Sequence, residues 1–104
     1  MTNKEYNGWY NYETWVVNLW MDNDEGSQAY WLEQAEECVK VDGKEDAVSS
    51  LEDLIKEDHE QRWSGINQDR ASVFSDLMGA ALSEVNWREI AQHLVDEVEV
   101  EAEA

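Results

Sequence analysis

The sequence predicts an all-α fold, a compact bundle of about five helices followed by a flexible acidic tail. Proline is absent and the five glycines fall mostly between periodic segments, which allows helices to run between short turns. Apolar residues recur at helical spacing through most of the 104 residues, and 42% of the chain is hydrophobic. This apolar content is enough for one core. We therefore assign residues 1–96 to a single helical domain and 97–104 to the tail.

The first helix is predicted to begin at an Asn11 N-cap and to end near Asp22, before an Asn-Asp-Glu-Gly turn at 23–26. Apolar residues at i, i+3, i+4, i+7 and i+8 mark its predicted buried face. These residues are Tyr12, Trp15, Val16, Leu19 and Trp20.

The second and third helices are predicted from about Ser27 to Lys40 and from about Lys44 to His59, with a turn at 41–43 between them. Their predicted buried residues are Trp31, Leu32, Ala35, Cys38, Val39, Ala47, Val48, Leu51, Leu54 and Ile55. Cys38 is the only cysteine, which excludes an intrachain disulfide, and its apolar surroundings predict an inert core thiol.

Residues 61–67 are predicted to form a loop whose Trp63 and Ile66 pack back onto the bundle. The fourth helix is expected to begin near Gln68 or Asp69 and to bury a stripe of Val73, Phe74, Leu77, Met78, Ala81 and Leu82.

The fifth helix has the clearest predicted start, because Asn86 and Glu89 have the spacing of a capping box. Its predicted buried face comprises Trp87, Ile90, Ala91, Leu94, Val95 and Val98. From residue 97 glutamate alternates with valine or alanine. A single strand would have no partner in a helical chain, so we expect a frayed, solvated tail.

Charge is the most unusual property of the chain. Its 25 acidic and seven basic side chains give a formal charge of −18, and residues 24–63 hold 13 of the acids and four of the bases. Ordinary outer faces of helices mix both signs, so this excess favours a strongly basic partner over a merely solvated face, which is the alternative. The predicted partner-binding residues are Glu33, Glu36, Glu37, Asp46, Asp53, Glu57 and Glu60.

The last four of these carboxylates form a row on one side of the third predicted helix. A rise of about 1.5 Å per residue separates them by roughly 10, 6 and 4–5 Å along the axis, intervals comparable with the spacing of phosphates along a nucleic-acid strand.

Catalytic chemistry has little support in the sequence, which contains no GxSxG, no phosphate-binding glycine loop and no HExxH. Residues 22–26 with Glu33 have nearly the spacing of a calcium loop, but the glycine is fifth instead of sixth. Glu89, His93 and Glu97 share one helical face, a pattern more typical of an exposed surface than of a metal site. We expect no enzyme activity, no metal and no cofactor.

No apolar stretch is long enough to span a bilayer, and the first residues have no signal-peptide core. With a single cysteine, this predicts a cytoplasmic protein.

Two segments resemble a known family. Residues 7–20, Asn-Gly-Trp-Tyr-Asn-Tyr-Glu-Thr-Trp-Val-Val-Asn-Leu-Trp, and the turn at 23–26 resemble the opening of a family of small proteins encoded by phages and plasmids. Residues 85–91, Val-Asn-Trp-Arg-Glu-Ile-Ala, are similar to its second block. The resemblance implies a mobile element in a bacterial cell and brings no activity with it. In size and charge, not in motif, the chain is similar to DNA mimics that block restriction or CRISPR nucleases.

Two functions follow as hypotheses. The first is a non-enzymatic DNA-mimic inhibitor from a phage or plasmid, whose carboxylates occupy the DNA-binding groove of a host defence nuclease or another basic DNA-binding protein. Such a chain is not expected to bind nucleic acid or membranes directly, because both are anionic. The alternative is a structural or interaction module that forms a homodimer or small complex through an apolar patch at Trp9, Tyr10 or Trp63, the charge being incidental.

Overall fold

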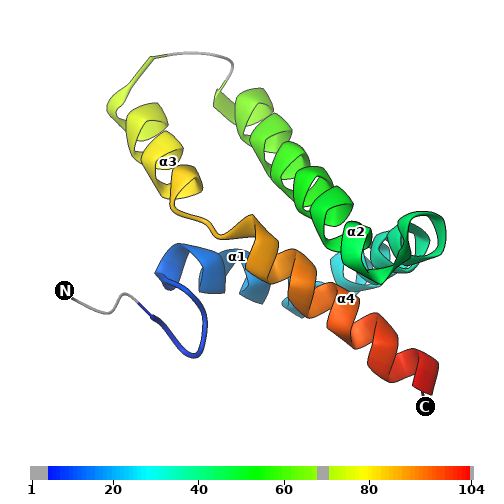
Figure 1. The fold of residues 1–104 in the computed structure, drawn as a ribbon. Coiled ribbons are helices and arrows are strands. Elements are labelled where there is room, and N and C mark those ends of the chain that lie inside the picture. Colours follow the sequence, from blue (N-terminus) through cyan, green and yellow to red (C-terminus); the bar gives the residue numbers. More distant parts are fainter. Residues whose placement is uncertain (1–4, 68–70, 104) are drawn as a thin grey trace.

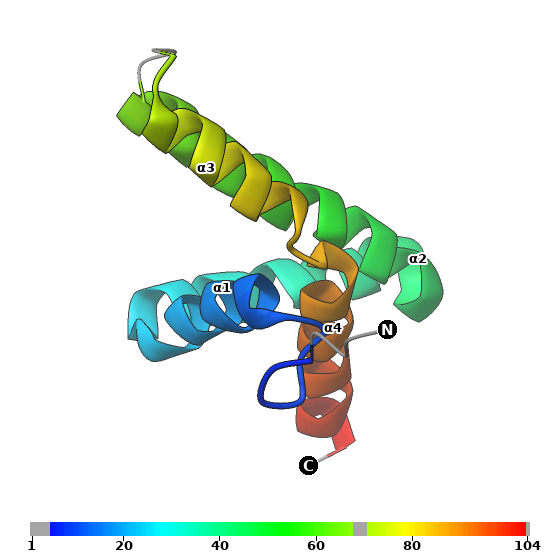
Figure 2. The same ribbon diagram turned by 90° about the vertical axis from the view of Figure 1, so that its left-hand side faces the viewer.

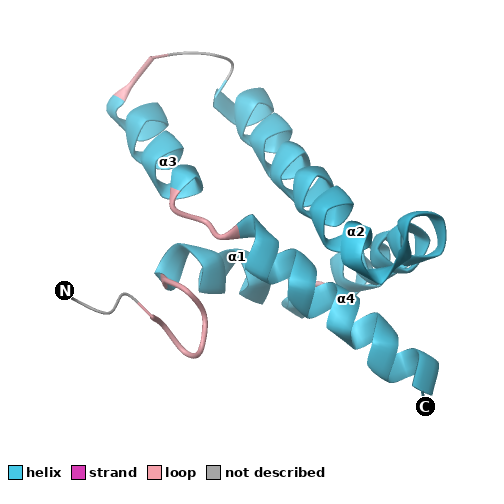
Figure 3. Ribbon diagram, in the orientation of Figure 1, coloured by secondary structure: helices cyan, strands magenta, loops and turns pink. Residues whose placement is uncertain are grey.

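The computed structural model describes residues 5–67 and 71–103, in which every regular element is a helix (Figures 1 and 3). The helices are α1 (Tyr12–Asn23), α2 (Glu25–Asn67), α3 (Val73–Ser83) and α4 (Trp87–Glu103). The all-α class is confirmed, with four helices in the described ranges instead of five.

The missing boundary lies in α2, which combines the second and third predicted helices. Gly43 has φ 79° and ψ 164°, so it interrupts the helical conformation and divides α2 into a first arm (25–42) and a second arm (44–67). The second arm folds back along the first (Figure 2), and Ser50 Oγ donates a hydrogen bond of 2.8 Å to Asp42 Oδ2 across the turn. The predicted turn at 41–43 is therefore reduced to one glycine.

The predicted loop at 61–67 is wrong, since these residues continue the second arm of α2 as helix. Gly65 has the weakest helix preference among them, and one glycine inside a helix costs only about 1 kcal/mol.

The core forms where the two arms of α2 meet α4. The predicted inner faces of these segments are largely confirmed, although Leu54 is 42% exposed. The buried apolar residues are Met21, Trp31, Ala35, Cys38, Ala47, Val48, Leu51, Ile55, Val85, Trp87, Ile90, Ala91, Leu94 and Val95.

Helix α1 turns a different face inward from the one predicted. Its buried residues are Thr14, Asn18 and Met21, whereas Trp20 is 71% exposed. Trp15 is half-buried, with its ring 4.8 Å from that of Tyr6, in an aromatic cluster at the surface. The predicted stripe is wrong because polar side chains at the start of α1 are held inside by hydrogen bonds.

These hydrogen bonds connect the start of α1 to the start of α4, and so join the two sequence blocks of the resemblance. Asn11 Oδ1 accepts from the Thr14 amide at 3.0 Å, as predicted for the N-cap, and Asn11 Nδ2 donates to the Glu84 carbonyl at 2.6 Å. Thr14 Oγ1 donates to Asn11 Oδ1 at 2.6 Å and accepts from the Asn86 amide at 2.8 Å. These residues therefore have a clear structural role.

Replacing Thr14 by Val is expected to lower the free energy of unfolding by about 1–3 kcal/mol, because the isosteric side chain leaves the Asn86 amide without its acceptor. Thr14 is fully buried, so water cannot take over that bond. Urea denaturation followed by circular dichroism measures the effect. Thr14→Ser keeps the hydroxyl and loses only the methyl group, so it serves as the control; a loss in Thr14→Val no larger than about 0.5 kcal/mol would contradict the predicted contribution of the hydrogen bond.

Helix α3 begins at Val73, after a Ser72 N-cap whose Oγ accepts from the Ser75 amide at 3.1 Å. The start predicted near residues 68–69 lies outside the described residues. The predicted burial of its stripe is wrong, since α3 contains no buried residue; Ala81 and Leu82 are partly buried. Helix α3 and the second arm of α2 project together away from α1 and α4, which leaves the far side of α3 uncovered by the described helices (Figures 1 and 2).

Trp63 is half-buried beside α3, but Ile66 is 75% exposed, so only the first of these residues packs back as predicted.

Helix α4 confirms the Asn86 N-cap, whose Oδ1 accepts from the Glu89 amide at 3.1 Å. The helix continues to Glu103, so the flexible tail predicted at 97–104 is wrong for 97–103, and residue 104 lies outside the described residues. Alternating glutamate, valine and alanine contain no helix breaker, and Val98 packs against the core, which explains the continuation.

Candidate acidic interface

All seven carboxylates predicted to bind a partner are exposed, and all lie on α2. The first arm carries Glu33, Glu36 and Glu37, and the second arm carries Asp46, Asp53, Glu57 and Glu60. Because the arms fold back on one another, carboxylates distant in sequence lie near each other.

Two adjoining hollows of about 230 and 400 Å³ lie between the arms and share Gln34 and Leu54 in their linings. Glu57 lines the first hollow and Glu37 the second. Glu33 and Asp53 each lie one helical turn away from these residues, on the same helix faces. We refer to the two hollows, with Glu37 and Glu57 in their linings and Glu33 and Asp53 beside them, as the acidic groove.

The other three predicted residues lie outside the acidic groove. Glu60 lines a cleft of about 540 Å³ between the second arm and α3, Asp46 lies close to the turn at Gly43, and Glu36 is rotated about 100° from Glu37 around the first arm. On the second arm, the four carboxylates of the predicted row lie within about 60° of one another around the helix axis, although Glu57 and Glu60 line different hollows.

The carboxylates of this surface have few partners within the protein. Glu57 accepts a hydrogen bond of 3.0 Å from Gln61 Nε2. In residues 5–67 and 71–103, no ion pair or side-chain hydrogen bond involves the other six predicted residues. Arg62 pairs with Asp58 at 3.0 Å and Arg88 with Glu52 at 3.5 Å, so these two cations are engaged elsewhere. The groove carboxylates remain available to external cations.

Apolar surface lies between the groove carboxylates. Leu54 is 42% exposed at the junction of the two hollows, and Val41 is 71% exposed at the end of one. The long aliphatic stems of lysine and arginine side chains can pack on such surface while their charged ends pair with carboxylates.

Cys38 lines the same hollow but is largely buried. Burial raises the pKa of the Cys38 thiol, and the nearby charges of Asp42 and Glu37 raise it further. The thiol is therefore protonated at neutral pH, which fits the predicted core residue and gives no activated nucleophile.

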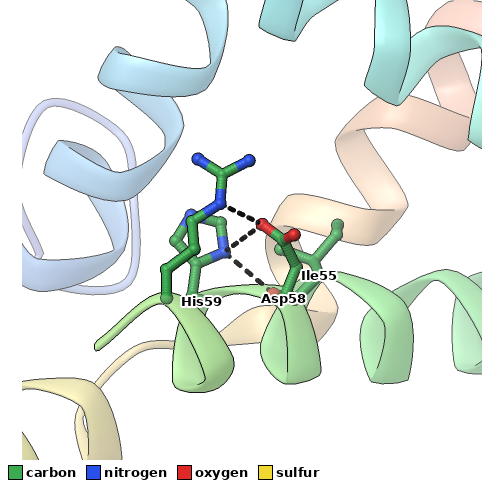
Figure 4. Close-up of polar contacts among 4 residues, drawn as sticks. Ile55, Asp58 and His59 are labelled. Atoms are coloured by element: carbon green, nitrogen blue, oxygen red, sulfur yellow. Dashed lines mark hydrogen bonds and ion pairs between the residues drawn. The ribbon is translucent and has the colours of Figure 1, made fainter. Parts of the chain in front are cut away.

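A second polar cluster lies near the end of α2 (Figure 4). His59 Nδ1 lies 2.8 Å from the Ile55 carbonyl oxygen, so it carries a proton and donates to that oxygen. Asp58 Oδ2 lies 4.0 Å from the same nitrogen and pairs with Arg62. The His59 ring packs 5.3 Å from that of Trp87, so this cluster attaches the second arm to α4.

The side chains of Glu89, His93 and Glu97 on α4 make contacts within the protein. Glu89 Oε1 accepts from the Tyr10 amide at 2.9 Å, and His93 Nε2 lies 3.1 Å from Glu97 Oε1. The described residues contain no cluster of three or more His, Cys, Asp or Glu side chains placed to hold a metal ion. At the predicted helix-to-helix turn of residues 23–26, Asp24 Oδ1 accepts from the Gly26 amide at 3.0 Å and so caps the start of α2.

The three residues suggested for the alternative function differ in exposure. Trp9 is half-buried, with its ring 5.2 Å from that of His93, while Trp63 lines the cleft beside α3. Tyr10 is 58% exposed. Further exposed apolar residues, Val73, Phe74, Leu77 and Met78, lie on α3.

In the part of the chain that the structure describes, no helix has the length and apolar character required to cross a membrane. No curated protein and no solved structure matches the chain. A model described as a family of unknown function, DUF7249, matches residues 2–103. The match spans almost the whole sequence, from before α1 to the end of α4, and the chain therefore belongs to the DUF7249 family.

Proposed function

We propose that the chain is a non-enzymatic acidic inhibitor that acts in the cytoplasm of a bacterium and is encoded by a phage or plasmid. Its acidic groove occupies the DNA-binding groove of a basic protein, for which a restriction or CRISPR nuclease is the leading candidate. The observation that supports this proposal best is the meeting of carboxylates from both arms of α2 at one groove, with few partners of their own.

The mechanism is competition with DNA. A net charge of −18 attracts a cationic surface over long range and raises the association rate. At contact, the lysine and arginine side chains of the target pair with Glu33, Glu37, Asp53 and Glu57 in place of phosphates, and their aliphatic stems cover Leu54. Salt screens the attraction, so inhibition weakens as ionic strength rises.

Removing two groove charges should weaken inhibition strongly. We expect Asp53→Asn with Glu57→Gln to raise the inhibition constant about 10- to 100-fold, since two charge-assisted contacts are lost. Fluorescence anisotropy of a labelled DNA duplex bound to restriction and CRISPR nucleases, with the chain as competitor, measures the effect at low and high salt.

The matched control removes two exposed charges that do not line the groove, Asp76→Asn on α3 with Asp96→Asn on α4. Its net charge equals that of the groove variant, so it should change inhibition by less than about threefold. Equal losses in both variants would mean that overall charge, not the groove, determines binding. No competition by the wild type with any of these nucleases would contradict the proposed function.

A further inference from the structure

The exposed side of α3 is apolar. Val73, Phe74 and Leu77 are 62%, 72% and 62% exposed, and Met78 is 39% exposed. Together with Ala81 they occupy one side of the helix at i, i+1, i+4, i+5 and i+8, and we call these five residues the α3 stripe.

The stripe faces away from the rest of the protein. The cleft between α3 and the second arm of α2 is lined on α3 by Gly79, Leu82 and Ser83. At about 100° per residue, Gly79 and Ser83 lie nearly opposite the centre of the stripe. Helix α3 thus turns Gly79, Leu82 and Ser83 toward α2 and its other large apolar residues toward solvent.

An uncovered stripe of this kind is costly. An isolated helix of 11 residues is marginal in water, and most helical stability comes from packing of the apolar face. The stripe exposes roughly 400–500 Å² of apolar surface, close to the largest patch of a typical monomer. Its burial against another surface would stabilise α3.

The charges around the stripe indicate what covers it. Asp76 is the only charged residue in 71–83, and it lies about 130° from the centre of the stripe. The stripe is therefore a neutral surface on a chain of charge −18, where a second copy can approach with the least repulsion.

The order of side chains along the stripe is also largely self-complementary, since every member except Val73 has a counterpart in the stripe of a second copy. In an antiparallel pair of α3 helices with the two-fold axis between positions 77 and 78, Phe74 faces Ala81 of the second copy and Leu77 faces Met78 of the second copy. Large residues then oppose small ones at the ends and flexible ones meet at the centre, as close packing requires. We propose that the α3 stripe is a homodimer interface that joins two copies of the chain about a two-fold axis.

The proposed dimer is weak and is strengthened by salt. Two stripes bury at most roughly 800–1,000 Å², below the 1,200–2,000 Å² of a stable interface, which is typical of a weak, transient dimer. Repulsion between two negatively charged copies opposes formation of the dimer. Salt screens this repulsion and so strengthens the dimer, whereas salt weakens the binding of the chain to a basic partner. The dimer and the proposed inhibition are therefore distinguishable, and neither depends on the other.

Sedimentation equilibrium of the whole chain over a range of concentrations, at low and high NaCl, tests the proposal. We expect a monomer–dimer equilibrium that strengthens with salt. Leu77→Asp should raise the dissociation constant by about tenfold or more, because it places two like charges close to the axis. Val41→Asp is the control, because it adds the same charge on α2, at a residue that is 71% exposed. It should change the dissociation constant of the dimer by less than about twofold.

Disulfide trapping provides an independent readout. In a Cys38→Ala background, Leu77→Cys should give a covalent dimer with oxidised glutathione, and Val41→Cys should stay monomeric. Thermal unfolding of each variant shows whether the fold is retained, and Phe74→Ser replaces Leu77→Asp if that variant unfolds. A chain that remains monomeric at millimolar concentration, or equal weakening by Leu77→Asp and Val41→Asp, would overturn the proposal.

Discussion

Trp31→Ala is expected to lower the free energy of unfolding by about 3–5 kcal/mol, as is typical for a buried tryptophan in a core. Trp31 is 3% exposed and packs in the cluster formed by the arms of α2 and by α4. The free energy of unfolding of a whole small domain is only about 5–15 kcal/mol. This variant should therefore be largely unfolded, or unfold at a much lower temperature.

Two other tryptophans serve as controls. Trp20 is 71% exposed, so Trp20→Ala should change the free energy of unfolding by no more than about 0.5 kcal/mol. Trp15 is half-buried against Tyr6 and Tyr12, so Trp15→Ala should fall between the two, at roughly 1–2 kcal/mol. Thermal and urea unfolding followed by circular dichroism measure the loss of unfolding free energy in each of the three variants. A larger loss for Trp15 than for Trp31 would favour the inner face of α1 predicted from sequence.

The difference at α1 shows where sequence periodicity has its limit. Hydrophobic periodicity assigns the largest apolar residues to the core, and for α4 this is correct because apolar residues of another helix cover its stripe. In α1 the buried positions include Thr14 and Asn18, and Thr14 is bonded to a residue 72 positions away. A contact of that range is not visible in any short window of sequence, although the caps at Asn11 and Asn86 are.

Helix α3 and the acidic groove show a second limit. Periodicity predicts correctly that α3 is amphipathic, but it carries no information on which element covers the apolar side. The exposure of the seven carboxylates on α2 could likewise be predicted from their polarity. Which of them share a groove depends on how the chain turns at Gly43, because that turn places Glu37 beside the arm that carries Glu57.

Gly43 is for this reason the backbone position with the largest predicted effect. Its φ of 79° and ψ of 164° lie in a region that is essentially restricted to glycine, and other residues pay about 1–3 kcal/mol there. A Cβ added at this position meets no atom within 4 Å, so the cost comes from the backbone alone. In a helix, alanine is also more favourable than glycine by about 1 kcal/mol, so the substitution favours a continuous, straight α2 without the turn at residue 43.

We therefore expect Gly43→Ala to lower the free energy of unfolding by about 1–3 kcal/mol and to weaken any binding that depends on the acidic groove. Gly65→Ala is the matched control, since Gly65 lies inside the helical second arm with open space around its Cα. There the same substitution should raise the free energy of unfolding by about 0.5–1 kcal/mol. Urea denaturation measures both. If both substitutions changed the free energy of unfolding in the same direction, the positive φ at Gly43 would not be required for the turn between the arms. The packing of the first arm on the second would then determine that turn.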